Sequence, residues 1–285
     1  MKYDPVKRSL GNFFNRSPFL RILFYKLLDL LLLRSWHIRR ELKQLEKGGL
    51  NTEQKGGLVP EQKGGLDPEH IADAGSGFGQ YVYYLSQKFP RAKITGLDIK
   101  KEQIEDCNRF FKTIHLDDRV VFEYSDLTLL DRDNEFDLIL SVDVMEHIED
   151  DRTVFLNLHR ALRPEGVLLI STPSDQGGSD VHHEEDESFI DEHVRDGYGM
   201  DEIVEKLRQA GFSEIHARYS YGRPGKISWK LSMKYPILMV NISKLFLILL
   251  PFYYLITFPV SYFLNRADVR RSHETGTGLI VKCRK

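Results

Sequence analysis

Cysteine is scarce in this chain, since only Cys107 and Cys283 occur among 285 residues. Two cysteines cannot form the disulfide framework that is typical of small secreted proteins, so the sequence favours the reducing cytosol. A secretory signal peptide is not predicted either, because charged residues interrupt the apolar stretch 19–33 and no small-residue cleavage site follows it. The same charges argue against a spanning helix there, which needs about 20 apolar residues.

Charge is distributed unevenly, although the net charge is only −2. Residues 1–47 contain eleven Lys/Arg and four Asp/Glu, and residues 222–274 contain eight and two, so these regions carry +7 and +6 and the remainder −15. Both basic regions are rich in apolar residues, which favours an anionic membrane surface over nucleic acid as a partner. For 1–47 we expect an amphipathic helix that lies on a membrane or over an apolar pocket, or that packs on its own domain.

A short repeat follows this N-terminal region. The motif Lys-Gly-Gly-Leu occurs at 47–50, 55–58 and 63–66. Units of this length cannot bury a core, and paired glycines disfavour both helix and strand. We therefore predict a flexible Gly-rich linker at 48–67, followed by one domain that comprises 68–221 and 275–285.

From residue 71 onward, short apolar stretches alternate with helical patterns. We predict strands at 71–74, 93–98, 120–124, 136–142, 167–172, 212–219 and 277–283, and helices at 79–89, 101–114, 153–162 and 200–210. This alternation predicts an α/β fold whose mostly parallel sheet is covered by helices on both faces. Such sheets bind ligands at the carboxyl ends of their strands.

Alternate glycines follow the first predicted strand, at Gly75, Gly77 and Gly79. Glycine at a strand-to-helix turn permits positive φ and a close approach of backbone to a ligand, and the next amides point at that ligand. The spacing G-x-G-x-G differs from the dinucleotide fingerprint G-x-G-x-x-G, which makes NAD or FAD less suitable. Further polar residues end the next three strands, namely Asp98, Asp126 and Ser141.

A series of motifs in this order resembles the class I S-adenosylmethionine-dependent methyltransferases, most closely the small-molecule and lipid branch that includes ubiquinone- and menaquinone-type enzymes. The motifs are Asp-Ala-Gly-Ser-Gly-Phe-Gly at 73–79, Gly-Leu-Asp-Ile at 96–99, Ser-Asp-Leu at 125–127, and the segments 136–148 and 162–173. The resemblance covers about 71–221 and the last strand. It implies a Rossmann-like seven-stranded sheet in which strand 277–283 lies antiparallel between the fifth and sixth strands.

The resemblance also implies S-adenosylmethionine as the cofactor and a set of residues that bind it. Gly75 and Gly77 would line the methionine part, Asp98 would bind the ribose, and Ile99 beside it belongs to the same set. Asp126 and Leu127 would contact the adenine, and Ser141 and Val142 the sulfonium end. Asp73 also belongs to the set, although it has the alternative role of capping the glycine turn.

Catalytic candidates lie beyond the fourth and fifth predicted strands. Methyl transfer depends mainly on in-line positioning, and a base is needed only when the acceptor carries a proton of high pKa. The candidates are His147 with its neighbour Glu146, and His193, Arg195 and Tyr198 in the following loop. Glu146-His147 has a helix-start contact as its alternative. The acidic run 182–187 lacks a defined ligand spacing, so no metal site is predicted.

The segment 222–274 interrupts the α/β pattern. Its apolar run, 235–264, contains Pro251 and Pro259, which we expect to break it, and basic residues flank it. Two spanning helices would need about 40 apolar residues, and a single one would separate the last two strands of the sheet. We therefore expect a shallow helical hairpin or an in-plane pair of helices at a membrane, with interfacial aromatic residues, namely Trp229, Tyr253, Tyr254 and Tyr262. The alternatives are a buried lid and a dimer interface.

Together these features predict a methyltransferase on the cytoplasmic side of a membrane. Its acceptor would be lipid-soluble, such as an isoprenoid quinone, a polyprenyl or sterol-like compound, or an aminophospholipid whose anionic headgroup meets Arg223 and Lys226. No nucleic-acid partner is expected. Two alternatives stay open: a membrane-tethered methyltransferase for a soluble molecule, and a non-catalytic protein that binds S-adenosylmethionine and acts in assembly.

Overall fold

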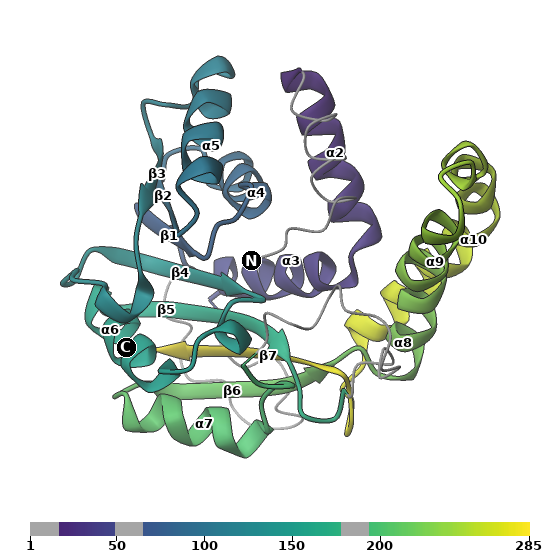
Figure 1. Ribbon diagram of the computed structural model, residues 1–285. Coiled ribbons are helices and arrows are strands. Elements are labelled where there is room, and N and C mark those ends of the chain that lie inside the picture. Colours follow the sequence, from purple (N-terminus) through teal and green to yellow (C-terminus); the bar gives the residue numbers. More distant parts are fainter. Residues whose placement is uncertain (1–16, 49–64, 178–193) are drawn as a thin grey trace.

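The computed structural model describes residues 17–48, 65–177 and 194–285. Seven strands form one sheet in the order β3-β2-β1-β4-β5-β7-β6 (Figure 1). Their bounds are β1 His70–Ala74, β2 Lys93–Asp98, β3 Val120–Tyr124, β4 Phe136–Val142, β5 Leu162–Pro173, β6 Ser213–Ser220 and β7 Gly278–Arg284. The pairs among β1 to β5 are parallel, whereas β7 is antiparallel to β5 and β6. The predicted fold class and the antiparallel last strand are confirmed.

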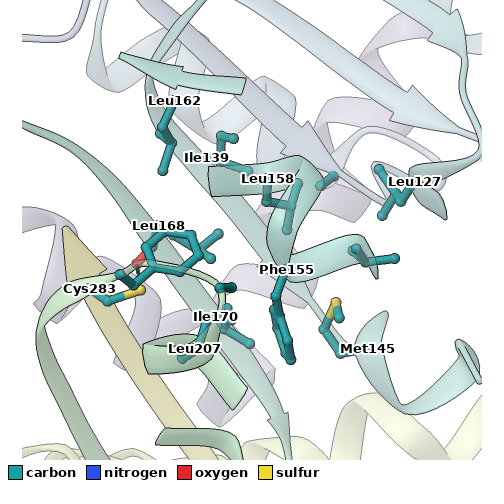
Figure 2. Close-up of a cluster of buried hydrophobic side chains, with 14 of the residues drawn as sticks. Leu127, Ile139, Met145, Phe155, Leu158, Leu162, Leu168, Ile170, Leu207 and Cys283 are labelled. Atoms are coloured by element: carbon teal, nitrogen blue, oxygen red, sulfur yellow. Dashed lines mark hydrogen bonds between the residues drawn. The ribbon is translucent and has the colours of Figure 1, made fainter. Parts of the chain in front are cut away.

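Helices cover both faces of the sheet. The helices α4 Gln80–Lys88 and α5 Lys101–Thr113 pack on one face, and α6 Asp151–Ala161 and α7 Met200–Gln209 pack on the other. In β5, Val167 and Leu169 belong to the first apolar cluster, while Leu168 and Ile170 belong to the second (Figure 2). Successive side chains of a strand point to opposite faces of the sheet, so this alternation shows that β5 is buried on both faces.

The N-terminal region forms two helices, α2 Pro18–Leu31 and α3 Leu33–Glu46, where we expected one. Ser17 caps α2 by accepting a hydrogen bond from a backbone amide of its first turn. Leu32 has extended backbone angles, with φ −83° and ψ 114°, and so separates the helices. α3 packs against the sheet through Ile38 and Leu42, so this helix belongs to the domain itself. The predicted linker falls mostly outside the described residues.

Between β6 and β7 the chain forms a helical hairpin that projects from the sheet (Figure 1). Its outgoing arm comprises α8 Arg223–Trp229, a π-helical segment Lys230–Lys234 and α9 Tyr235–Ile242, and α10 Phe246–Arg270 returns. A hairpin is one of the two predicted arrangements. The expectation that Pro251 and Pro259 break the returning arm was wrong, because α10 continues through both residues.

Contacts between the two arms account for this continuity. A proline in a helix interior costs about 3 kcal/mol or more, which packing against a second helix can offset. The Tyr253 and Tyr254 hydroxyls donate to the carbonyls of Leu231 and Ser232, at 2.7 and 2.8 Å, in the π-helical segment. Two of the tyrosines predicted for a membrane interface therefore satisfy backbone carbonyls within the hairpin.

Among the described residues, α10 is the one helix that could span a membrane by length and composition alone; it has 25 residues, and the mean hydropathy of its most apolar stretch of 18 residues is 1.8. The topology opposes a single crossing. The hairpin begins after β6 and ends before β7, which are neighbouring strands of one sheet. Both ends of the hairpin therefore lie on the same side of any membrane.

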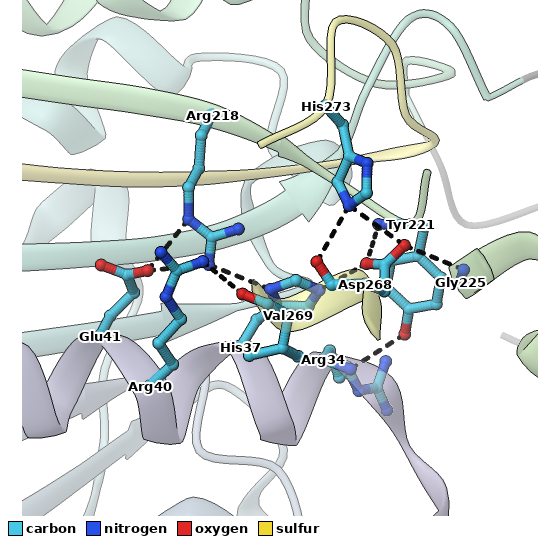
Figure 3. Close-up of polar contacts among 10 residues, drawn as sticks. All are labelled: Arg34, His37, Arg40, Glu41, Arg218, Tyr221, Gly225, Asp268, Val269 and His273. Carbon is cyan, nitrogen blue, oxygen red and sulfur yellow. Dashed lines mark hydrogen bonds and ion pairs between the residues drawn. The ribbon is translucent and has the colours of Figure 1, made fainter. Parts of the chain in front are cut away.

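The base of the hairpin is fixed by a buried polar network around Asp268 (Figure 3). Asp268 accepts hydrogen bonds from His37 Nε2 at 2.9 Å, from the Tyr221 amide at 3.2 Å and from the Gly225 amide at 2.9 Å. The other ring nitrogen of His37 lies 3.0 Å from Arg218 Nη2. Burial lowers the pKa of His37 to about 4, and a neutral ring with its proton on Nε2 suits both neighbours. The network connects α3, β6 and both ends of the hairpin.

Candidate functional site

The glycine turn between β1 and α4 lies at the carboxyl edge of the sheet, where the strand order reverses between β1 and β4. Gly75, Gly77 and Gly79 have φ values of 84°, 52° and 84°. A Cβ on Gly75 would lie 2.2 Å from a methyl group of Val144, whereas a Cβ on Gly77 would meet no atom within 4 Å. Gly75 is therefore required by packing, and the open space beside Gly77 can admit a ligand.

Asp98, at the end of β2, is bound to the same turn. Its Oδ2 accepts the Gly77 amide and its Oδ1 accepts the Lys100 amide, both at 2.8 Å. Each carboxylate oxygen has a second acceptor position, so Asp98 can still accept ligand hydroxyls. The adjacent Ile99 is 54% exposed and offers an apolar surface at this edge.

Asp73 is buried at the end of β1, and its Oδ2 has no hydrogen-bond partner. The amides of Gly75 and Ser76 donate to the Leu97 carbonyl, at 2.8 and 2.9 Å. Asp73 therefore does not cap the glycine turn through these two amides, which was its alternative predicted role. Burial and the nearby Asp98 raise the pKa of Asp73 to about 8. A cationic group bound beside Asp73 would favour the charged carboxylate and supply the missing partner.

Asp126 begins a short turn after β3. One of its oxygens accepts the amide and the hydroxyl of Thr128, at 2.9 and 2.7 Å, so Asp126 shapes this turn itself. Leu127 is buried beneath it. A hollow of about 290 Å³ is lined by Tyr124, Asp126 and Leu129 among others, and it provides further space at the carboxyl edge of the sheet.

The carboxyl end of β4 lies next to the glycine turn. Ser141 and Val142 are buried there, and the Ser141 hydroxyl has no hydrogen-bond partner. Asp143 follows with φ 52°, and its side chain forms an ion pair with Arg34 of α3. Glu146 is also buried, accepts the Thr172 hydroxyl at 3.1 Å, and has a pKa that burial raises.

The predicted catalytic residues lie in different surroundings. His147 is exposed on the turn that follows β4, whereas His193 and the acidic run 182–187 fall outside the described residues. Tyr198 is fully buried, and its hydroxyl donates to Asp151 at 2.7 Å. Arg195 forms an ion pair with the same carboxylate. Because both connect the loop before α7 to the start of α6, this placement favours a structural role for Arg195 and Tyr198.

The N-terminal helices also contribute to the site, and the sequence reasoning did not identify these residues. Arg21 Nη2 and the Tyr25 hydroxyl donate to the Phe78 carbonyl, at 2.9 and 2.5 Å, inside the glycine turn. Gln80, at the start of α4, donates to Asp29 at 2.8 Å. The sequence did contain a sign of this contact. Arg21, Tyr25 and Asp29 interrupt the apolar stretch 19–33 at a spacing of four, which places them on one helical face.

These surroundings fit S-adenosylmethionine. The space beside Gly77 admits its methionine part, the unpaired oxygen of Asp73 can accept a hydrogen bond from its amino group, and Asp98 can accept ribose hydroxyls. The unpaired hydroxyl of Ser141 lies at the next strand end. Asp73, Gly77, Asp98 and Ser141 therefore lie on a single edge of the sheet, as the strand ends predict.

Comparison with known proteins identifies the class. Residues 67–211 match the family model described as "Methyltransferase domain". Phosphoethanolamine N-methyltransferase 1 of Arabidopsis thaliana is 29% identical over 155 residues, which cover 52% of this chain and 29% of that protein. The 27-O-demethylrifamycin SV methyltransferase of Amycolatopsis mediterranei is 29% identical over 167 residues, covering 56% and 59%. The chain spans less than two thirds of the length of either relative.

A solved structure shows the same fold. Phosphoethanolamine N-methyltransferase 2 of Haemonchus contortus, in complex with phosphomonomethylethanolamine and S-adenosylhomocysteine, has a TM-score of 0.56 and 16% identity, covering 90% of this chain and 56% of that one. The chain belongs to the methyltransferase domain family. This membership confirms the predicted enzyme class and S-adenosylmethionine as the predicted cofactor.

Proposed function

We propose that the protein methylates a lipid-soluble acceptor at the cytoplasmic surface of a membrane, with S-adenosylmethionine as the methyl donor. The acceptor is an isoprenoid quinone, a polyprenyl or sterol-like compound, or an aminophospholipid. The observation that carries this proposal is the hairpin between β6 and β7. Its two arms contact each other through small and polar residues, and its outer surface is apolar.

Small and polar residues form the contact between the two arms. The buried positions are Gly225, Ser228, Ser232 and Pro236 on the outgoing arm, and Ser261, Asn265 and Asp268 on α10. Both sets follow helical spacing, and the Ser228 hydroxyl donates to the Ser261 carbonyl at 3.3 Å. Small residues allow two backbones to approach closely, which is how helices associate when lipid surrounds them.

The outer surface of α10 is apolar. Ile248, Phe252, Leu255 and Ile256 are 69, 66, 75 and 75% exposed, and only 6% of the most apolar window of α10 is buried. Large exposed apolar surfaces of this kind mark sites of membrane or protein interaction. Basic residues at both ends of the apolar run add attraction to anionic lipid, namely Lys230, Lys234, Arg266, Arg270 and Arg271.

The base of the hairpin is connected to the cofactor-binding edge. The hydroxyl of Tyr221, just before the hairpin, accepts the Arg34 amide at 3.1 Å. The Arg34 side chain pairs with Asp143, which directly follows Ser141 and Val142 at the end of β4. The base of the hairpin therefore lies close to this edge, which supports delivery of an acceptor from lipid beside the hairpin.

S-adenosylmethionine supplies an activated methyl group on a sulfonium. The glycine turn and Asp98 would hold the cofactor, and the end of β4 would form the floor of the site. In-line positioning of the acceptor contributes most of the rate. When the accepting atom carries a proton of high pKa, Glu146 and His147 are the groups at this strand end that can accept it.

Labelled methyl transfer tests the proposal. The protein is incubated with methyl-labelled S-adenosylmethionine and total membrane lipid, and the products are identified by mass spectrometry. We expect label in a lipid-extractable product. Label that enters only water-soluble acceptors would favour a tethered methyltransferase for a soluble molecule, and cofactor binding without any transfer would favour the assembly role.

Membrane association is tested separately by flotation with vesicles that contain anionic lipid. The variant I248Q/F252Q/I256Q changes only exposed side chains, preserves Asp268, and introduces a residue with good helix propensity. We expect it to lose flotation and to retain cofactor binding. The control L156Q, which alters a 52% exposed leucine on α6, should float like the wild type. Unaltered flotation of the triple variant would contradict the membrane role of the hairpin.

A further inference from the structure

An apolar stripe on α2 lies on the helix face opposite its buried side chains and is partly exposed. Its members are Phe19, Leu23, Leu27 and Leu30, which are 73, 40, 39 and 40% exposed. Spacings of three and four place them on one helical face. The buried residues of the same helix are Arg21, Tyr25 and Asp29. A helix that packs on a soluble domain normally buries its apolar face, so the reversed orientation of α2 indicates an apolar partner outside the domain.

The stripe is continuous with the apolar surface of the hairpin. The Trp36 indole donates to the Leu30 carbonyl at 3.0 Å, and its ring contacts Tyr262 of α10 edge-on, with centroids 5.2 Å apart. Tyr262 in turn contacts Phe263, whose side chain is 68% exposed, at 5.7 Å. In Figure 1, α2 rises from the end of α3, whereas the hairpin rises from the neighbouring ends of β6 and β7; both extend toward the same end of the molecule while leaning apart. A bilayer that receives the hairpin is therefore the partner that best fits α2.

The inner face of α2 contacts the cofactor site. The Phe78 carbonyl, which lies between Gly77 and Gly79, accepts hydrogen bonds from Arg21 and Tyr25. The Arg21 guanidinium also pairs with Asp106 of α5 at 2.6 Å. One helix thus has the exposed apolar stripe on its outer side and the glycine turn on its inner side.

We propose that α2 is a second membrane-binding element and that lipid contact on its outer stripe tightens cofactor binding at the glycine turn. This inference rests on the proposed membrane association of the hairpin. Lipid stabilises α2 in the position from which Arg21 and Tyr25 bind the Phe78 carbonyl, so the turn is already ordered when the cofactor arrives. The exposed Lys26 at the edge of the stripe suits an anionic headgroup. Because binding free energies are coupled reciprocally, the cofactor tightens vesicle binding by the same factor.

The test is the dissociation constant for S-adenosylmethionine, measured with and without vesicles of phosphatidylcholine and phosphatidylglycerol. We expect vesicles to lower the wild-type value about 5-fold or more, as a coupling of ordinary size would. The variant L23Q/L27Q changes only the outer stripe, so it should keep the lipid-free value and should still float through the hairpin. It should lose the effect of vesicles on cofactor affinity.

Other results would overturn the inference in distinguishable ways. A wild type that floats but binds the cofactor equally well with and without vesicles refutes the coupling and leaves the proposed function intact, as does a vesicle effect that persists in L23Q/L27Q. Failure of the wild type to float would contradict the membrane part of the proposed function as well.

Contact of α2 with lipid is measured directly with a polarity-sensitive fluorophore on the variant L23C. Labelling is selective because both native cysteines, Cys107 and Cys283, are buried. We expect a blue shift when vesicles are added, and none for the control D201C on α7. If position 23 shows no shift although the protein floats, another part of the chain covers the stripe and the inference is wrong.

Discussion

Cofactor binding is expected to release a proton from Asp73. This carboxyl group is buried, lacks a partner at Oδ2, and has a pKa that burial and Asp98 raise to about 8. At pH 7, a group with this pKa is about 90% protonated. An opposite charge within about 4–6 Å lowers a carboxyl pKa by about 1–3 units, and the amino group of S-adenosylmethionine is a cation of this kind. Binding should therefore convert Asp73 to its charged form.

The size of the effect follows from these values. If the pKa falls from about 8 to between 5 and 7, then Asp73 releases about 0.4 to 0.9 proton per bound cofactor at pH 7. The variant D73N has nearly the same shape but cannot ionise, so it releases none from this position. Subtracting the proton release of D73N from that of the wild type cancels the protons released by the ligand and by other groups of the protein.

Isothermal titration calorimetry in two buffers of different ionisation enthalpy measures this release. We expect the wild type to release more protons than D73N by the amount given above, and we expect D73N to bind the cofactor more weakly. Equal proton release by the two proteins would refute the reasoning, because Asp73 would then keep its protonation state when the cofactor binds.

Three further predictions follow from the geometry. G75A should lower the Tm strongly, because its Cβ would lie 2.2 Å from a methyl group of Val144 in addition to the cost of its positive φ. G77A has the cost of a positive φ but meets no atom within 4 Å, so it should lower the Tm less and should weaken cofactor binding. Equal losses of Tm would contradict this distinction. Denaturant titrations should show that, from pH 6.5 to pH 4, the wild type loses about 3 kcal/mol more unfolding free energy than H37Q. Burial lowers the pKa of His37 from 6.5 to about 4, so this ring gains a proton on unfolding and stability falls as the pH falls; parallel pH curves would exclude that role. Y198F should lower stability by about 1–2 kcal/mol, because it removes the bond to Asp151; a large fall in kcat at unchanged Tm would instead make Tyr198 catalytic.

The sequence predicted the sheet well because its strands are buried on both faces and their ends carry distinctive residues. The strands β2 and β4 have the predicted bounds, since apolar runs and flanking turns mark them. β5 begins earlier than predicted, because Leu162 pairs with Phe136 across an irregularity in the ladder. Asp98 and Ser141 could be placed at the ligand-binding edge from the sequence alone, because each lies at or near the end of a predicted strand.

Contacts between distant parts of the chain could not be predicted from periodicity. His37 and Asp268 are 231 residues apart, and Arg34 and Asp143 are 109 apart, yet these pairs connect the hairpin and α3 to the cofactor-binding edge. The reversed orientation of α2 depends on its partners in the glycine turn. Continuity of α10 through its prolines likewise depends on the opposite arm of the hairpin.

Transfer of a labelled methyl group into vesicle-borne membrane lipid, compared between the wild type and I248Q/F252Q/I256Q, tests the central claim most directly. The account predicts that the wild type labels a lipid-extractable product, and that the variant binds S-adenosylmethionine normally but labels that product far more slowly. Equal labelling by both proteins, or label confined to water-soluble products, would contradict it.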